Sequence, residues 1–152
     1  MLGRLARWLR VLGFDTAYDA MLADPALVRL AAAEERILLT RDRHLLRELR
    51  PARALEIQND VPLDQLRTVV TALGLTPPPE LFTRCLLCNT PLSAPLAAAD
   101  ASSLLPPAAR GLPGPVRVCP QCGRVYWPGS HVRRMRRALA SALPGWAGEP
   151  SR

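Results

Sequence analysis

Apolar residues at the start of the chain recur every three or four positions, which is the period of an amphipathic helix. Leu2, Leu5 and Leu9 belong to the apolar set, arginines are interleaved with them, and Gly13 ends the pattern as a helix C-terminal glycine does. An arginine-rich, acid-free start is also the composition of a mitochondrial presequence, but sequence of a folded type follows without a spacer. We therefore predict that residues 2–12 form the first helix of a folded domain.

Short apolar runs then alternate with helical patterns. The predicted strands are 16–18, 37–40 and 55–57, and the predicted helices are 24–35, 43–50 and 63–73. Strands and helices that alternate at this spacing indicate βα units around a parallel sheet, so the expected fold class is α/β.

Each predicted strand is followed by at least one aspartate. Asp19 and Asp24 follow the first strand, Asp42 the second and Asp60 the third. Parallel sheets bind ligands beyond the carboxyl ends of their strands. A single acid there is usually a helix cap, which fits Asp42 and also Asp24, since Pro25 follows it. Acids after three successive strands also fit a shared Mg²⁺ or Mn²⁺ site, so both interpretations stay open.

The composition changes after the stiff linker Thr-Pro-Pro-Pro at residues 76–79. Beyond the linker the strands become short, cysteines appear and acidic residues almost vanish. We predict a first domain over residues 1–80, a second over 81–143 and a tail over 144–152.

Two Cys-x-x-Cys pairs dominate the second domain. They are Cys85-Leu-Leu-Cys88-Asn89 and Cys119-Pro-Gln-Cys122-Gly123. Four thiolates in two such pairs are typical of a structural zinc site, and Asn and Gly tolerate the positive φ that a metal knuckle needs. Disulfides or a redox pair are the alternatives, but no thioredoxin-like unit surrounds either motif. The Ala- and Pro-rich residues 90–118 between the pairs are expected to be exposed and partly mobile.

A basic segment follows the second cysteine pair. Its candidate nucleic-acid contacts are Arg124, His131, Arg133, Arg134, Arg136 and Arg137. Arginines beside aromatic residues can pair with phosphates and stack on bases. Alternatively, Tyr126 and Trp127 cover the metal core, which we favour for these aromatics, and the arginines form a solvated helix face. His131 could bind a phosphate, donate a proton or ligate a metal, although four cysteines already complete a zinc shell.

Charge is concentrated in the second half of the chain. The 152 residues carry a formal net charge of +7. Residues 1–84 hold 12 arginines and 11 acids, whereas residues 85–152 hold 8 arginines and 2 acids, so the surplus lies around the cysteine motifs. A cationic surplus favours a polyanionic partner. No apolar run is long enough to span a bilayer, so we expect no membrane association, and without a signal peptide the expected compartment is the cytoplasm.

Taken together, these motifs resemble the Mut-7 C-terminal RNase family, a PIN-like nuclease domain followed by a zinc ribbon. The resemblance rests on the opening Met-Leu-Gly-Arg-Leu-Ala-Arg-Trp-Leu-Arg-Val-Leu-Gly-Phe-Asp-Thr, on Ile37-Leu-Leu-Thr-Arg-Asp42, on both cysteine motifs, on Arg-Val-Tyr-Trp127 and on Gly-Ser-His131. These motifs extend over most of the chain in a fixed order.

The resemblance implies a three-layer α/β/α PIN-like domain that cleaves RNA with Mg²⁺ or Mn²⁺ held by carboxylates, with a structural Zn²⁺ in the ribbon and no small-molecule organic cofactor. Asp42 matches the family's aspartate after its buried strand, and Asp24 matches a recurrent acid. Asp19 and Asp60 rest on the strand-end argument alone.

One departure from the family pattern is expected to matter. Family members usually carry a strand ending in aspartate directly before the Met-Leu-Gly motif, so either the start lies upstream of Met1 or this version lacks that strand and acid. The rival hypothesis is therefore a catalytically inactive zinc-ribbon protein that binds nucleic acid. A ribbon that serves as a protein-interaction module is a third interpretation.

Overall fold

The computed structural model describes residues 2–148, which form two compact units. Unit 1 contains the residues up to Trp8 together with Ala17–Thr76, and unit 2 contains Leu9–Thr16 together with the chain from Pro77 onwards. Helix α1 (Gly3–Val11) supplies residues to both. A functional boundary at residue 80 stays a prediction. Among residues 2–148, none of the helices combines the length and the apolar composition that crossing a bilayer requires.

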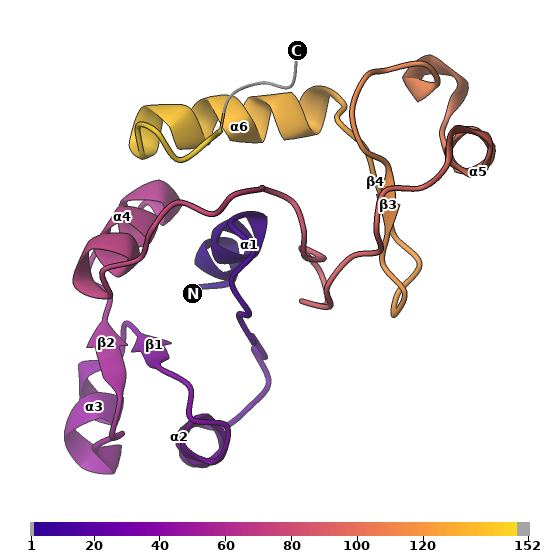
Figure 1. The fold of residues 1–152 in the computed structure, drawn as a ribbon. Helices are drawn as coiled ribbons and strands as arrows, with labels where there is room; N and C mark the ends of the chain where they lie inside the picture. The colour runs from indigo at the N-terminus through magenta and orange to yellow at the C-terminus, as the bar shows by residue number, and fades with distance from the viewer. Residues whose placement is uncertain (1, 149–152) are drawn as a thin grey trace. The chain divides into compact units, whose positions relative to one another are not determined.

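Unit 1 is a mixed α/β unit with a small parallel sheet (Figure 1). Its elements after α1 are α2 (Asp24–Ala33), β1 (Leu38–Thr40), α3 (Arg43–Leu49), β2 (Ala54–Glu56) and α4 (Pro62–Ala72). Strands β1 and β2 run parallel, with Thr40 opposite Glu56. The predicted alternation of helices with parallel strands is confirmed for these elements.

A buried cluster explains why α2, β1 and α3 pack together. Ala31 of α2, Leu38 of β1 and Leu45 of α3 are each at most 9% exposed and contact one another, with Leu27, Val28, Leu46 and Leu49 around them. Burial of Leu or Ile side chains contributes roughly 1.5–3 kcal/mol each relative to exposure. The packing therefore fixes the carboxyl end of β1, where Asp42 lies.

Three details of unit 1 differ from the prediction. Residues 16–18 form no strand, so Asp19 and Asp24 follow no strand of the sheet. Asp24 is the first residue of α2 and not its cap, because Ala23 takes the N-cap position without a side-chain bond. Strand β2 begins and ends one residue earlier than expected, although the N–H of Ile57 still donates to Thr40, 2.8 Å away.

Unit 2 consists of small elements around two cysteine loops. They are α5 (Ala98–Leu104), a 3₁₀ turn at Pro107–Ala109, β3 (Arg117–Val118), β4 (Val125–Tyr126) and α6 (Ser130–Ala142). Strands β3 and β4 are antiparallel, and Arg84 forms an isolated bridge with Pro91. This arrangement of short strands beside two cysteine loops is compatible with a zinc ribbon.

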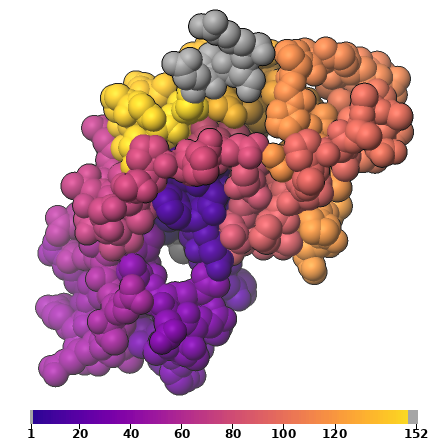
Figure 2. Space-filling view, in the orientation of Figure 1, coloured from indigo at the N-terminus to yellow at the C-terminus, as the bar shows by residue number. Residues whose placement is uncertain are grey.

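The segment between the cysteine pairs contains structure that the sequence did not predict. It contains α5 and a core of its own, formed by Ala101, Leu105, Ala109 and Val116, with Trp127 packed against it. Figure 2 shows this segment in space-filling form, coloured from salmon to orange. Most residues of this segment are exposed, as predicted, but the sequence did not predict the small core at which these Ala, Leu and Val side chains meet. Its partial mobility stays a prediction.

Candidate functional site

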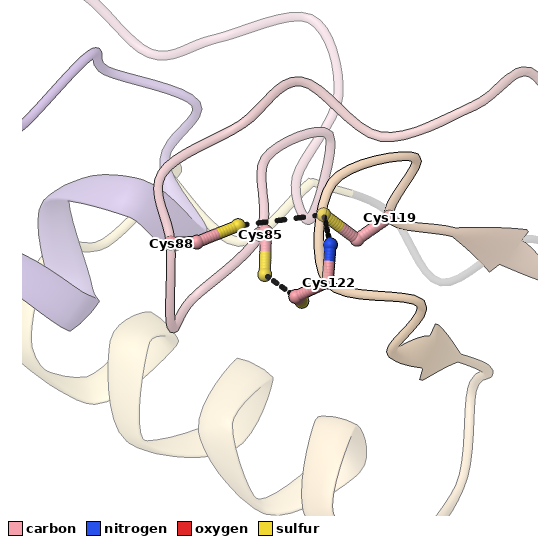
Figure 3. A group of neighbouring side chains, drawn as sticks. All are labelled: Cys85, Cys88, Cys119 and Cys122. Atoms are coloured by element: carbon pink, nitrogen blue, oxygen red, sulfur yellow. Dashed lines mark hydrogen bonds between the residues drawn. The ribbon is translucent and has the colours of Figure 1, made fainter.

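The four cysteines converge from two loops on one point (Figure 3). Their sulfur atoms all lie within 4.8 Å of one another, with 3.4 Å between Cys88 and Cys119 and 3.7 Å between Cys85 and Cys122. Cys85 and Cys119 are buried, whereas Cys88 and Cys122 are exposed. A tetrahedron of thiolates about 2.3 Å from a zinc ion has sulfur–sulfur edges of about 3.8 Å, so the donor set and its spacing fit Zn²⁺.

Each loop closes in the same way. The N–H of Asn89 donates to the carbonyl of Cys85 at 3.0 Å, and the N–H of Gly123 donates to that of Cys119 at 2.9 Å. Both turn residues have positive φ, 69° for Asn89 and 74° for Gly123. The predicted need for positive φ after each second cysteine is confirmed, and the backbone N–H of Cys122 points at the sulfur of Cys119 at 3.5 Å.

The environment favours the thiolate at the first pair. Hydrogen bonding with the side chain and backbone of Thr90 lowers the pKa of Cys88 to about 6. Burial raises the pKa of Cys85, but the Tyr126 hydroxyl and the backbone of the loop outweigh it and the pKa is lowered. At Cys122 the backbone of Arg124 lowers the pKa, yet burial and the neighbouring thiols raise it to about 11. Four thiols crowded this closely cannot all ionise without a cation between them.

Tyr126 supports the cluster from β4. Its hydroxyl lies 3.1 Å from the sulfur of Cys85 and accepts a hydrogen bond from the N–H of Leu86 at 2.9 Å. Burial, together with the bond to Cys85, raises the pKa of this tyrosine. Tyr126 therefore covers the metal core, as the favoured interpretation of the sequence predicted.

The first cysteine loop is also held by a segment that precedes it by some seventy residues. Arg10, only 6% exposed, donates to the carbonyl oxygens of Leu86 at 2.8 Å and Leu87 at 3.1 Å, the two residues between Cys85 and Cys88. The Asn89 side chain accepts from the N–H of Thr16 at 2.9 Å.

Two further side chains extend this network. The Asn89 amide donates to Asp15 at 2.6 Å, and Arg84 donates to the carbonyls of Gly13 at 3.3 Å and Asn89 at 2.7 Å. The sequence did not predict this network. Arg10, for example, has the same position in the amphipathic pattern as the exposed arginines of the helix. Its spacing carries no sign of burial.

Asp42 lies directly beyond the carboxyl end of β1. Its Oδ1 accepts hydrogen bonds from the N–H of His44 at 2.7 Å and of Leu45 at 3.2 Å, so it is the N-cap of α3, as predicted. The hydroxyl of Thr40 accepts from the N–H of Asp42 at 3.0 Å and fixes the turn. The cap orients one carboxylate oxygen toward the helix and leaves the carboxylate exposed at the sheet edge.

Asp60 lies at the same edge of the sheet. It follows β2, and its carboxylate pairs with Arg41, which stands between β1 and Asp42. Glu56, the last residue of β2, pairs with Arg43 at 2.6 Å, and this hydrogen bond raises the pKa of Arg43. Asp42 and Asp60, which follow the two parallel strands, thus lie at one edge of the sheet. Glu56 joins them because it is the last residue of β2, whereas the predicted strand 55–57 placed it inside the strand.

The other two predicted acids lie elsewhere in unit 1. Asp19 accepts from the N–H of Met21 at 2.8 Å in an exposed turn, and Asp24 begins α2. Over the described part of the chain, the four cysteines alone bring three or more potential ligand atoms close together, so Asp19, Asp24, Asp42 and Asp60 do not gather into such a group.

The predicted nucleic-acid contacts divide into two groups on α6. Arg133, Arg134 and Arg137 are exposed, together with His131, and form one face of the helix. Arg136 is half-buried, lies 5.6 Å from the centroid of the Phe82 ring and donates to the carbonyl of Ala147 at 2.9 Å. The predicted run of arginines is therefore one solvated cationic face and one packed residue. Arg124 is exposed just after the second cysteine loop.

These features define a mixed α/β protein with a small parallel sheet and a four-cysteine cluster of zinc-ribbon type. The chain matches the family model of the Mut7-C RNAse domain over residues 1–139, and it belongs to that family. The resemblance stated from the sequence motifs is confirmed, and membership indicates a nuclease-type function. The comparisons with curated proteins and with solved structures found no match.

Proposed function

We propose that the protein is a metal-dependent ribonuclease that cleaves RNA phosphodiesters, with unit 2 holding the RNA. The observation that carries the proposal is the match to the Mut7-C RNAse domain over residues 1–139, which includes both the acidic sheet edge and the cysteine cluster. A cluster of four cysteines that binds zinc as thiolates is typical of proteins in a reducing compartment such as the cytoplasm, which supports the proposed localisation.

Asp42 is the leading catalytic candidate in this proposal. It is exposed at the carboxyl edge of β1, and its N-cap bonds fix its position. Asp60 and Glu56 share that edge, while Asp24 and Asp19 remain weaker candidates within unit 1. Mg²⁺ usually takes one or two carboxylates together with waters and substrate phosphates, so this donor set fits without a closed cage of acids.

The chemistry divides between the metal and the chain. When bound, Mg²⁺ or Mn²⁺ polarises the phosphate and lowers the pKa of a bound water. Asp42 would hold such an ion. Asp60 would bind it too, once a substrate phosphate has replaced Asp60 as the partner of Arg41. Arg41 and Arg43 would then bind the phosphates that displace their carboxylate partners. Each of these charge-assisted bonds would help to orient the RNA strand for cleavage.

The cationic face of α6 supports RNA binding by unit 2. Arg133, Arg134 and Arg137 project from one helix face with His131 at its first turn, and no acidic residue lies in α6. Phosphate contacts of this kind supply affinity without sequence specificity. Arg124 adds a further cation of the same unit.

A second candidate function is RNA binding without cleavage. It is favoured by one observation, namely that the four predicted acids do not form a group of close ligand atoms within residues 2–148. Under this alternative the acidic residues serve as helix caps and ion-pair partners, and the zinc ribbon is the functional part.

Asp42→Asn is the discriminating experiment. Asn is as good an N-cap as Asp, so this variant keeps α3 while it removes the charge that would hold the metal, whereas Asp42→Ala would also cost about 1 kcal/mol of capping energy. We expect Mg²⁺- or Mn²⁺-dependent cleavage of a labelled RNA to disappear in Asp42→Asn with unchanged zinc content. Asp64→Asn, which lies in α4 and pairs with Arg67, is the matched control and should remain active.

Two results would redirect the assignment. Full activity of Asp42→Asn would remove Asp42 from the catalytic set, and the same comparison for Asp24→Asn, Asp19→Asn and Asp60→Asn would then identify the true acids. A wild-type protein that binds RNA in a salt-sensitive way but does not cleave it in either metal would establish the second function.

A further inference from the structure

A groove on unit 2 combines aromatic rings, prolines and two arginines. It is lined by Phe82, Trp127, Pro128, Val132, Arg117 and Arg136, and its volume is about 210 Å³. Pockets for drug-sized ligands start at about 300 Å³, so this groove is sized for a single ring system. Its lining also includes Glu80, whose carboxylate pairs with Arg117 at 2.6 Å.

The indole of Trp127 is held in a fixed orientation at this groove. One side of the residue packs against the Ala101–Val116 core, so the ring is supported from behind. A Cβ placed on Gly129 would lie 2.8 Å from the indole nitrogen, which shows that the ring rests directly on the glycine. Rings immobilised in this way lose little conformational entropy when a ligand stacks on them.

Phe82 and Arg136 also line the groove. Phe82 has a left-handed φ of 57°, which is costly for a bulky residue, and yet it is 8% exposed with its N–H bonded to Val11. Backbone strain of this kind often marks ligand sites. The ring supports the Arg136 guanidinium, whose bond to Ala147 uses one of its five N–H donors.

Arg136 also links the groove to the cationic face of α6. Successive residues of an α-helix are rotated by about 100°, so Arg133 lies about 60° around the axis from Arg136 and Arg137 about 100° from it, next to Arg133. A nucleic-acid strand whose phosphates follow Arg133 and Arg137 would therefore present a base at the groove. Bases can turn out in this way only from unpaired strands.

We propose that this groove is a base-binding subsite that takes one unstacked nucleobase of single-stranded RNA, with Trp127 as the stacking platform and Arg136 as the hydrogen-bond donor. The inference rests on the proposed function and adds the class of substrate to it. Proline-rich peptides also choose aromatic grooves. The guanidinium groups and the surplus of six arginines over acids in residues 85–152 favour RNA.

The test compares three fluorescein-labelled RNA ligands. They are a single strand that carries bases, a single strand that is abasic at every position, and a duplex formed by the first strand with its complement. Binding is measured by anisotropy with the zinc-loaded Asp42→Asn chain, so that cleavage does not intervene. We expect the base-bearing single strand to bind about tenfold more tightly than the abasic strand, in line with 1–3 kcal/mol per stacked base. Trp127→Ala should abolish that difference and leave binding of the abasic strand and of the duplex unchanged.

A second measurement keeps the proposal testable if Trp127→Ala fails to retain zinc. In Trp8→Phe/Trp146→Phe, Trp127 is the sole tryptophan, and stacking of a base should quench its fluorescence while the abasic strand should not. Equal binding of the two strands, or no quenching at saturation, overturns the subsite but leaves the proposed ribonuclease untouched. Absence of all RNA binding overturns both the subsite and the proposal that unit 2 holds the RNA. Loss of cleavage with RNA binding intact contradicts neither of these two proposals. Quenching by a proline-rich peptide, without quenching by RNA, overturns the subsite in favour of a protein partner.

Discussion

The guanidinium of Arg10 donates a hydrogen bond to the carbonyl oxygen of Leu86, 2.8 Å away and 76 residues later in the chain. Leu86 lies between the first two cysteines, so the second part of α1 is built into the zinc knuckle. A third bond from the same side chain reaches the carbonyl of Thr16 at 3.0 Å. One buried arginine thus bonds both to the backbone of the first cysteine loop and to that of Thr16.

Replacing Arg10 should destabilise unit 2 strongly. Arg10→Ala removes charge-assisted bonds to the carbonyls of Thr16, Leu86 and Leu87, and it leaves a buried gap. We expect the free energy of unfolding of the zinc-loaded protein to fall by about 2–4 kcal/mol, and zinc to be lost to a chelator at lower concentration. Chemical denaturation and a competitive zinc assay measure the two effects. Arg7→Ala, an exposed residue of the same helix, should change stability by less than about 0.5 kcal/mol and serves as the control.

Asn89 should separate backbone strain from side-chain bonding. Asn89→Gly keeps the positive φ but loses the bonds to Asp15 and Thr16, whereas Asn89→Ala loses the bonds and also strains the backbone. We expect the free energy of unfolding, measured by thermal denaturation, to be about 1–2 kcal/mol lower for Asn89→Ala than for Asn89→Gly. Asn89→Gly should in turn be less stable than the wild type. Gly123→Ala in the second loop should show the backbone cost alone, since a Cβ there meets no atom within 4 Å. Equal stability of the two Asn89 variants would refute the strain argument.

The fold was predictable wherever local chemistry decides it. Asp42 capping α3, Gly13 after α1 and the positive φ of Asn89 and Gly123 each follow from the residue type at a single position. The extent of β2 and the missing strand at residues 16–18 were not predictable, because strand pairing depends on partners distant in sequence. The core of the cysteine-to-cysteine segment was missed for the same reason. Its Ala and Leu side chains look unremarkable until α5 brings them together.

The candidate site shows the same division. The zinc ligands could be named from spacing alone, because two Cys-x-x-Cys pairs are the usual ligand pattern of a structural zinc site. The burial of Arg10 and the partial burial of Arg136 depend on tertiary packing, and no periodicity distinguishes either residue from its exposed neighbours. The pairing of Arg41 with Asp60 depends on parallel strands being adjacent, which only the assembled sheet reveals.

Removal of zinc should unfold the cysteine loops and leave the sheet of unit 1 in place. The four cysteines and hydrogen bonds such as those from Arg10 hold the loops, whereas β1 is buried against α2 and α3. Structural zinc contributes roughly 10 kcal/mol or more to folding in small modules. We expect chelator treatment to raise amide hydrogen exchange in residues 83–93 and 117–126 while the β1–β2 ladder stays protected. Cys119→Ser should reproduce the effect without chelator and lower the zinc content below one ion per chain, and Mg²⁺ should not reverse it. Simultaneous loss of protection in β1 and β2 would show that the sheet also depends on the metal.

The exposed arginines of α6 should set the salt dependence of RNA binding. Neutralising a phosphate contact on a single strand reduces the slope of log affinity against log salt by about 0.7, so Arg133→Gln/Arg134→Gln/Arg137→Gln should reduce the slope by about 2. The triple change lies on a solvated helix face and should leave zinc content and unfolding free energy nearly unchanged. Arg47→Gln, an exposed arginine of α3, controls for net charge and should leave the slope intact. A triple variant with the wild-type slope would show that these arginines of α6 do not contact RNA phosphates. It would also contradict the proposal that unit 2 holds the RNA.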